Sequence, residues 1–345
     1  MQFREIQNCE TKIVTDFLRQ QEFTPIWQAP LWGDFRAQAV QERPRRFGVW
    51  RGQELLAYCQ ILERIWPLNL RFWFGERGPL ILANSKGTAL PTLLAGITKI
   101  ARQEKIVGVR FDFPPRPEIA RAAANFFGSC NLRVVTKENF PQLTLRLNLR
   151  QTEEQLLAAM KPKARYNFRV AQKHGVTVTE ITQQSKIKIF YQLLKKTTQR
   201  DAFASHPEKF YADFLAFLGP QHASLFLAEQ AQVPLAAILV TFYGDTATYY
   251  FGASDYIFRN LMAPYACHFA AMRAARARGY RFYDFLGLAP LQDSQHALTG
   301  VSTFKRKFGG EEIQYPAGKE MIWRPGALRL VALGRSLKNF LKFFK

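Results

Sequence analysis

The stretch ITKIARQEKIVGVRFDF, residues 97–113, decides the fold, because a stretch of the same design recurs in the other half of the chain. FAAMRAARARGYRFYDF, residues 269–285, also begins rich in alanine, lysine and arginine and ends in an aromatic run with an aspartate. The first part of each is typical of a helix and the second of a strand. Asp284 lies 172 residues after Asp112, and a repeat at this distance indicates a structural duplication.

A second pair of landmarks repeats at nearly the same distance. Residues 49–62 and 227–240 each read as strand, tight turn and strand, and both second strands begin with Leu-Ala, at Leu56 and Leu235. Each half therefore predicts a mixed α/β domain of strand hairpins and helices, and two such domains suit a chain of 345 residues. The alternating run LTLRLNLR ends at residue 150, so we expect domain 1 over residues 1–150 and domain 2 over 151–317.

Charge and composition limit the class of partner. The chain has 48 lysines and arginines against 27 aspartates and glutamates, a formal net charge of +21, which favours a polyanionic partner such as nucleic acid, anionic lipid or a phosphorylated substrate. The four cysteines have no metal-ligand spacing, and no run of 18 apolar residues or secretory signal occurs. We expect a cytoplasmic protein without a metal site.

Two stretches of domain 2 are candidate anion sites. In MKPKARYNFRVAQKHG, residues 160–175, a helix would place Lys161, Arg165 and Arg169 on one face, as a phosphate-binding stripe or as an ordinary solvated face. Tyr166, Phe168 and Val170 in the same stretch can face the core. In TTQRDAFASHPEKFY, residues 197–211, cations surround a loop that enters a helix, which fits either an anion site or a simple surface loop.

The basic turn STFKRKFGGEE, residues 302–312, is the strongest candidate for chemistry. Three cations lie between Phe304 and Phe308, and Gly309-Gly310 would let a ligand approach the backbone; the alternative is an exposed basic turn. Asp112 and Asp284 at strand ends would act as bases or cap turns. The loop at residues 259–264 has no glycine, and its proline lacks an amide donor, which argues against a coenzyme A pyrophosphate cradle.

Four stretches together resemble the Fem family (FemA, FemB and FemX) of aminoacyl-tRNA-dependent peptidoglycan transferases. They occur in the family's order over residues 25–320: APLWGDFR, MKPKARYNFRVAQKHGV, YYFGASDYIFRNLMAPY with YRFYDFLGL, and STFKRKFGGEEIQYPAG. The resemblance implies two tandem GNAT-like (acyl-CoA N-acyltransferase-like) domains, with the segment after about residue 318 returning to domain 1. The chain has no room for the long coiled-coil arm of FemA and FemB, so it is similar to the armless FemX type.

The resemblance also implies a function. The family moves an amino acid from aminoacyl-tRNA to the amino group of a peptidoglycan precursor's stem peptide, carried on lipid II or UDP-MurNAc-pentapeptide, and needs no other cofactor. By this resemblance Lys305, beside the backbone of Phe304, stabilises charge on the tRNA ester, and Asp112 matches an aspartate considered as a base. The expected substrate contacts are Arg36, Arg200 or His206, and Tyr250, with Arg165 added from the basic stripe.

Three alternatives remain open from the sequence. The chain is also compatible with a GNAT-like transferase that uses aminoacyl-tRNA or acyl-CoA on a different amine or lipid acceptor, or with a non-enzymatic RNA-binding protein. The basic amphipathic segment at residues 325–345 fits a helix docked on domain 1 or an anchor lying on the membrane surface, which would make the protein peripheral at the inner face of the membrane.

Overall fold

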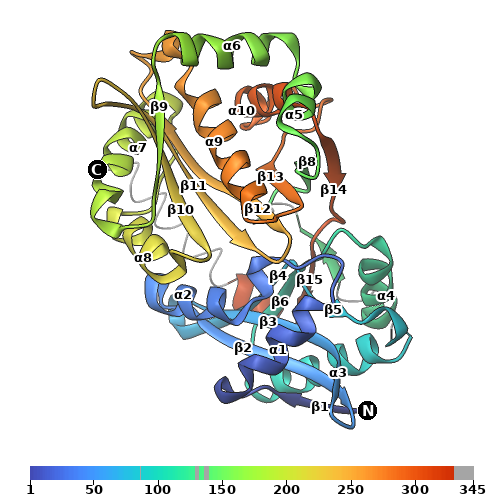
Figure 1. Cartoon of the computed structure of the whole chain (residues 1–345). Helices are drawn as coiled ribbons and strands as arrows, with labels where there is room; N and C mark the ends of the chain where they lie inside the picture. The colour runs from blue at the N-terminus through green and yellow to red at the C-terminus, as the bar shows by residue number, and fades with distance from the viewer. Residues whose placement is uncertain (86, 129–131, 136–139, 330–345) are drawn as a thin grey trace, which may run out of the picture. The chain divides into compact units, whose positions relative to one another are not determined.

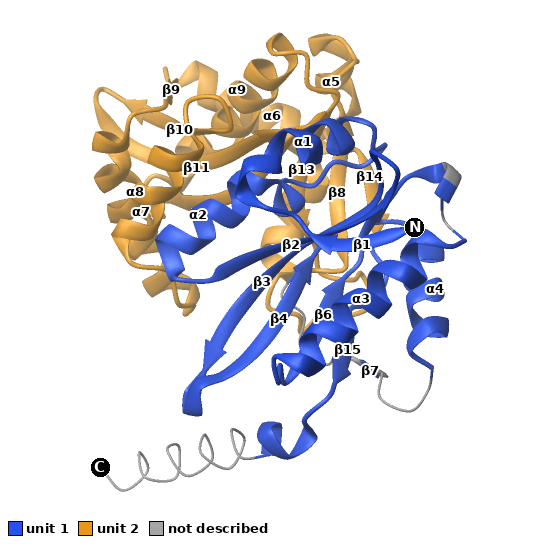
Figure 2. Ribbon diagram, turned by 90° about the horizontal axis from the view of Figure 1, so that it is seen from below, with its two compact units in different colours: residues 1–140, 315–345 blue, residues 141–314 orange. Residues whose placement is uncertain are grey.

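The computed structural model describes residues 1–85, 87–128, 132–135 and 140–329, and the chain divides into two compact units. Unit 1 consists of Met1–Phe140 and Tyr315–Lys345, and unit 2 of Pro141–Gln314 (Figure 2). Each unit contains one sheet with helices, so the predicted mixed α/β class is confirmed. No helix in the described ranges has both the length and the hydropathy needed to cross a bilayer.

The sheet of unit 1 has the order β1-β2-β3-β4-β6-β15-β7, with β5 paired to β3 (Figure 1). All its neighbouring strands are antiparallel except β4 and β6, which run parallel. Its strands are β1 (Gln2–Glu5), β2 (Arg43–Arg51), β3 (Glu54–Trp66), β4 (Leu70–Glu76), β5 (Leu80–Ile81), β6 (Gly108–Asp112), β7 (Leu132–Val134) and β15 (Lys319–Ile322). Its α-helices are α1 (Thr11–Arg19), α2 (Pro30–Val40), α3 (Ala89–Gln103) and α4 (Pro117–Phe127).

The sheet of unit 2 has the order β14-β8-β13-β12-β11-β10-β9, in which β12 and β13 are the parallel pair. Its strands are β8 (Leu143–Asn148), β9 (Thr177–Ile181), β10 (Ala223–Gln230), β11 (Val233–Tyr243), β12 (Thr246–Ser254), β13 (Phe282–Gly287) and β14 (Glu311–Gln314). Its α-helices are α5 (Glu153–Ala159), α6 (Pro162–Lys173), α7 (Ile187–Asp201), α8 (Glu208–Leu218), α9 (Ala263–Ala277) and α10 (Thr299–Lys305), and α10 continues into the 3-10 helix η7 (Arg306–Phe308).

The repeat seen in the sequence corresponds to the same piece of both units. In unit 1 a hairpin strand, β4, pairs in parallel with β6, which follows the long helix α3. In unit 2 the hairpin strand β12 pairs in parallel with β13, which follows α9. Parallel neighbours need a crossover connection, and an amphipathic helix supplies it in both halves. Asp112 and Asp284 therefore occupy equivalent places, each in the last residue pair of the parallel pairing.

The division of the chain differs from the expected boundary at residue 150. The alternating run that was assigned to domain 1 forms β8, which pairs with β13 and β14, so unit 2 begins at Pro141. β15 lies between β6 and β7 in the first sheet, and Ala327 and Leu328 pack beside Phe72 there. The rest of the amphipathic tail, residues 330–345, lies outside the described residues, and its two interpretations stay predictions.

The sheet of unit 2 has a different helix layer on each face. α9 and α6 cover one face, where Phe226, Ile238 and Val240 share a core with Phe168 and Phe269. α7 and α8 contact β10, β11 and β12 from the opposite face. Only six residues separate α7 from α8, between Asp201 and Glu208, so unit 2 has no coiled-coil arm there, as predicted.

Candidate active site

The central cation of the basic turn is buried. Lys305 ends α10 with only 6% of its surface exposed, and its Nζ donates a hydrogen bond to the carbonyl oxygen of Gly287 at 2.8 Å. Its neighbour Arg306 pairs with Glu312 at 2.6 Å. The alternative of an exposed basic turn is therefore wrong for Lys305, because α10 directs this side chain inward.

Divergence of the parallel strands makes room for the Lys305 side chain. β12 and β13 pair over only three residues each: the first pair is Thr246 with Phe282, and the last is Thr248 with Asp284. Beyond this point Gly287 of β13 accepts from Lys305, while the ring of Tyr249 on β12 lies 5.4 Å from Nζ. The ammonium thus lies where the two strands separate. Its hydrogen bond satisfies the carbonyl of Gly287, which has no hydrogen-bond partner on β12 because the two strands no longer pair there.

Two small contacts hold the basic turn in place. The Oγ of Ser302 in α10 accepts a hydrogen bond from the backbone N–H of Ala289 at 2.7 Å, which ties α10 to the segment after β13. Gly309 and Gly310 both have positive φ, +80° and +92°. A Cβ on Gly309 would lie 2.5 Å from the carbonyl oxygen of Ala159, so the close approach of the α5–α6 junction requires glycine.

An aromatic cluster surrounds the lysine. Phe304 and Phe308 flank it as the sequence indicated, with ring centroids 5.3 Å apart. His268, from the buried side of α9, packs 5.5 Å from Phe304, and its Nδ1 lies 2.9 Å from the hydroxyl of Tyr283. His268 is 1% exposed. The sequence did not indicate His268 as a site residue, because a single histidine within an apolar stretch of a helix belongs to no recognisable motif.

Burial changes the charge states of both groups. Desolvation lowers the pKa of Lys305 to about 8, against a smaller opposing effect of the Asp284 carboxylate. Desolvation, together with the nearby Lys305 ammonium, lowers the pKa of His268 to about 3. Near neutral pH the site therefore combines a charged lysine with a neutral histidine. A cation in such a poorly solvated place interacts strongly with negative charge that develops beside it.

The two strand-end aspartates differ in their surroundings. The carboxylate of Asp284 accepts hydrogen bonds from the Thr144 hydroxyl and from the N–H of Leu286, a residue with φ +58°, so it caps the irregular turn within β13, between Asp284 and Gly287. Of its two interpretations, the structure supports the turn cap. Asp112 is buried at the end of β6, where its register partner on β4 is Glu76.

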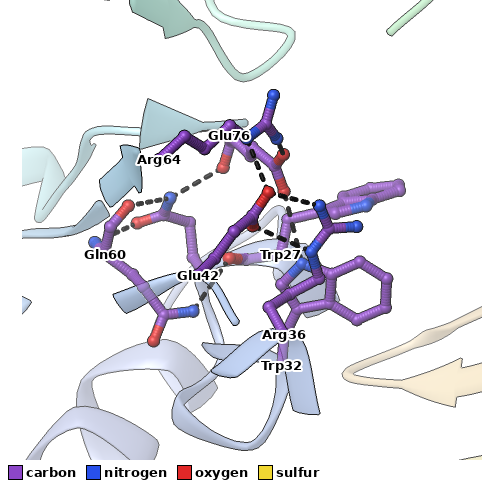
Figure 3. A network of polar contacts seen from close by, with 8 residues as sticks. Trp27, Trp32, Arg36, Glu42, Gln60, Arg64 and Glu76 are labelled. Atoms are coloured by element: carbon purple, nitrogen blue, oxygen red, sulfur yellow. Dashed lines mark hydrogen bonds and ion pairs between the residues drawn. The ribbon is translucent and has the colours of Figure 1, made fainter. Parts of the chain in front are cut away.

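Arg36 belongs to a buried network of alternating charges in unit 1 (Figure 3). Its guanidinium makes two hydrogen bonds to Glu42, at 2.9 and 2.7 Å. Arg64 forms ion pairs with both Glu42, at 2.6 Å, and Glu76, at 2.9 Å. The indole N–H of Trp32 donates a further hydrogen bond to the Glu76 carboxylate at 3.3 Å. Burial raises the pKa of Glu76, and the two arginines oppose that effect. The predicted phosphate contact is thus held in a fixed geometry by an acidic partner.

His206 and Tyr250 belong to one aromatic group of unit 2. His206 stacks on Phe210 at 3.9 Å, Phe210 meets Phe251 at 6.1 Å, and Phe251 meets Tyr250 at 4.8 Å. This group lies on the α8 side of the sheet, because Tyr250 contacts Phe214 of α8 at 5.6 Å.

The neighbouring β12 residue, Tyr249, instead contacts His268 of α9 at 4.6 Å. β12 has a bulge at Tyr250, and these ring contacts place the side chains of Lys305 and Tyr250 on opposite faces of the sheet of unit 2. Arg200 is separate from both: it binds the Asp201 carboxylate at 2.6 Å and lies 5.5 Å from the ring of Tyr256.

The basic stripe of α6 differs from its prediction in two places. The Nη1 of Arg165 donates to the carbonyl oxygens of Ala158 and Met160, so this guanidinium ties α6 to the end of α5. Tyr166, expected in the core, is 59% exposed. Phe168 is buried as expected, together with Ala164 and Ala171, whereas Val170 is half-buried.

Within the described ranges, no cluster of histidine, cysteine, aspartate and glutamate could hold a metal ion. The loop before α9 has the sequence Arg259 to Met262, without glycine, and Pro264 lies in the first turn of α9. That turn therefore offers one backbone N–H fewer to an anion.

The FemAB family model matches residues 118–230 and 221–319, which together cover more than half of the chain. Among curated proteins, the chain is 24% identical over 342 residues to the lipid II:glycine glycyltransferase of Staphylococcus saprophyticus subsp. saprophyticus, covering 77% of this chain and 80% of the relative. The protein of the same name from Staphylococcus aureus strain MRSA252 is 23% identical over 344 residues, with the same coverage.

Solved structures show the same fold. The crystal structure of FemX superimposes with a TM-score of 0.81 at 20% identity, covering 96% of this chain and 99% of FemX. A tandem GNAT protein from the clavulanic acid biosynthesis pathway gives a TM-score of 0.58 at 12% identity, covering 93% of this chain and 98% of that protein. Together with the two sheets described above, these likenesses confirm the predicted tandem GNAT-like architecture.

Proposed function

The chain belongs to the FemAB family and is an aminoacyltransferase, and from this premise we propose that it transfers an amino acid from aminoacyl-tRNA to the stem-peptide amine of a peptidoglycan precursor. The relatives are named for lipid II as acceptor, which favours a lipid-linked precursor over its UDP-linked form. The product would be an amino acid of the interpeptide bridge.

The observation that carries this proposal is the buried ammonium of Lys305. In the transfer, the amine nitrogen attacks the ester carbonyl, a C–N bond forms, and the C–O bond to the ribose breaks. The carbonyl oxygen becomes negatively charged on the way. Lys305 is placed in a low-dielectric site at the gap between β12 and β13, where a preformed positive charge stabilises such an oxyanion.

The reaction needs no protein nucleophile, because the tRNA ester is already activated. It does need the acceptor amine in its neutral form, and a substrate lysine has a reference pKa of about 10.4. Asp112 is the proposed proton acceptor, with the vicinal hydroxyl of the ribose as the other route. The leaving ribose oxygen takes up a proton, so the transfer as a whole is balanced. No cofactor beyond the charged tRNA enters this scheme.

Substrate contacts are proposed for the other predicted residues. Arg36 would contact a phosphate group in unit 1, Arg200 or His206 would contact a phosphate group in unit 2, and Tyr250 would contact the acceptor peptide. Both arginines already hold a carboxylate, Glu42 and Asp201, so a phosphate group must bind beside these acids or displace them. Arg165 would act indirectly, by holding α6 against α5.

The decisive experiment incubates the protein with bulk charged tRNA and either lipid II or UDP-MurNAc-pentapeptide, followed by mass spectrometry of the acceptor. We expect a mass gain of one amino acid residue that disappears after ribonuclease treatment. Lys305→Met should lower kcat by 100-fold or more, since removal of one oxyanion-stabilising group costs about 10²–10³.

Lys307→Met is the matched control, because it removes a cation from the same turn whose side chain has no partner among the described residues. It should retain most of the activity. Near-normal turnover by Lys305→Met would refute the assigned role. RNA binding without transfer to either acceptor would instead support the non-enzymatic alternative, and calorimetric binding of coenzyme A would support an acyl-CoA transferase.

A further inference from the structure

We propose that one exposed face of α6, formed by Lys163, Tyr166, Arg169 and Lys173, is the surface on which the RNA donor docks. This inference rests on the proposed function and adds to it the location of the RNA contact. These four residues are called the α6 face below. In Figure 1, α6 lies along the outer edge of unit 2, on the side of its sheet that α9 covers.

The geometry of α6 separates this face from the core. Ala164, Phe168 and Ala171 are buried, and the ring of Phe168 packs 4.3 Å from that of Phe269 in α9. With 3.6 residues per turn, the α6 face occupies the opposite side of the helix, and its side chains are exposed.

The charge of this face is not neutralised. α6 contains no acidic residue, and the side chains of Lys163, Arg169 and Lys173 form no ion pair with the part of the chain that the structure describes. Two other exposed cations of unit 2 do have acidic partners: Arg273 binds Glu153 and Arg278 binds Glu180. Uncompensated cations on one helix face are what a phosphate backbone requires.

Tyr166 adds an aromatic surface to these cations. It is 59% exposed, and the Lys163 ammonium lies 5.1 Å from its ring centroid. An exposed ring between cations suits an unpaired nucleotide, whose base stacks while its phosphate meets the charge. A bilayer is a poorer fit, because a helix lying on a membrane needs an apolar side to insert, and the apolar side of α6 is buried in the core.

The α6 face begins beside the proposed catalytic lysine. The backbone N–H of Lys161, at the start of α6, donates to the carbonyl oxygen of Lys307 at 2.9 Å. From Lys163 to Lys173 the helix then extends about 15 Å away from this turn. An RNA whose terminal ester lies at Lys305 therefore has a cationic path for its adjoining backbone.

The test compares two charge reversals of equal size in unit 2. Lys163→Glu/Lys173→Glu alters the α6 face, and Lys186→Glu/Lys188→Glu alters exposed positions at the start of α7, a helix of the other layer. The probe is unfractionated deacylated tRNA, with binding measured by fluorescence anisotropy at several salt concentrations. We expect the α6 pair to weaken binding about tenfold or more and the α7 pair less than about threefold.

The salt dependence gives a second readout. Each lost phosphate contact should lower the slope of log K against log salt by about 0.7–0.9, so the α6 pair should lower it by about 1.4–1.8. Tyr166→Ala should weaken binding several-fold at an unchanged slope, and Tyr166→Phe should restore it. Equal losses for the α6 and α7 pairs, or no loss for the α6 pair, would overturn the inference.

Two further measurements separate this inference from the proposed function. With a short donor, 3′-aminoacyl-adenosine, the α6 pair should lose far less activity than with full-length charged tRNA; equal losses would also overturn it. If the wild type transfers no amino acid from either donor, the proposed function is refuted. The comparison of tRNA binding between the two charge reversals would still show whether the α6 face binds RNA. If the α6 pair loses binding to anionic phospholipid vesicles and not to tRNA, the face is a membrane contact and the inference is wrong.

Discussion

Lys305 and His268 form a pair of ionisable side chains in a place where charge is poorly solvated. His268 lies on the buried side of α9, and Lys305 reaches the same aromatic cluster from α10. Both groups are pushed toward their neutral forms by burial, and the positive charge of Lys305 lowers the pKa of His268 further. A neutral imidazole at position 268 leaves Lys305 as the cation of this cluster.

The first prediction concerns acid stability. The pKa of His268 is about 3 in the folded chain and about 6.5 when the chain is unfolded, so between these values the unfolded chain binds more protons. The free energy of unfolding should therefore fall as the pH drops below 6.5, by about 2 kcal/mol from this residue between pH 7.5 and pH 5.

His268→Gln removes the titrating group and keeps a polar side chain for Tyr283. In urea unfolding at pH 7.5 and pH 5, this variant should lose about 2 kcal/mol less than the wild type between the two conditions. An identical loss in both proteins would show that His268 is not held neutral by the fold.

The element that builds the site is the parallel strand pair of unit 2 together with α10. β12 and β13 stay in register for three residue pairs and then separate, and α10 inserts Lys305 at that point. Gly309 and Gly310 follow η7 and let the chain turn back into β14 beside β8. The position of Lys305 thus depends on backbone conformations that only glycine adopts easily.

The second prediction tests these glycines. Gly310→Ala places a Cβ 2.7 Å from the carbonyl oxygen of Arg146 at a positive φ, so it should lower the free energy of unfolding by about 1–3 kcal/mol and reduce kcat. Gly300→Ala in α10 is the matched control. Apart from its chain neighbours and the backbone of its own helix, no atom lies within 4 Å of a Cβ built there, so this variant should be neutral or stabilise by up to about 1 kcal/mol. Chemical denaturation checks both values, and equal stability of the two variants would contradict the strain argument.

The described residues of the molecule form two sheets, and unit 1 takes strands from both sides of unit 2 in the sequence. β15 fills the position between β6 and β7, about two hundred residues after those strands in sequence. Unit 2 is formed by the intervening continuous segment. The first sheet is therefore complete only when the chain has passed through unit 2 and returned.

The third prediction follows from this connection. Met321 of β15 is buried and pairs with Val109 and Leu132, so Met321→Asp should destabilise the sheet of unit 1 by about 3 kcal/mol or more. Hydrogen exchange should rise in β6 and β7. Ile313→Asp in β14 is the reciprocal variant and should raise exchange in β8 of unit 2 instead. Equal increases in both sheets for either variant would mean that the two units open together.

The repeat, the mixed α/β class and the basic turn can all be recognised in the amino-acid sequence, because composition, periodicity and glycine placement act over short distances along the chain. The sequence also pointed to Lys305 through its two flanking phenylalanines. It could not show that Lys305 is buried against a β13 carbonyl, since that depends on where two strands separate in space.

Which side chains meet across elements depends on the tertiary structure. It brought His268 to Lys305, turned Arg165 onto the carbonyls of α5, and left Tyr166 outside the core. It also moved β8 into unit 2 and β15 into unit 1. Helical spacing shows that a helix has faces, but only the neighbour that packs against one of them decides which face is buried.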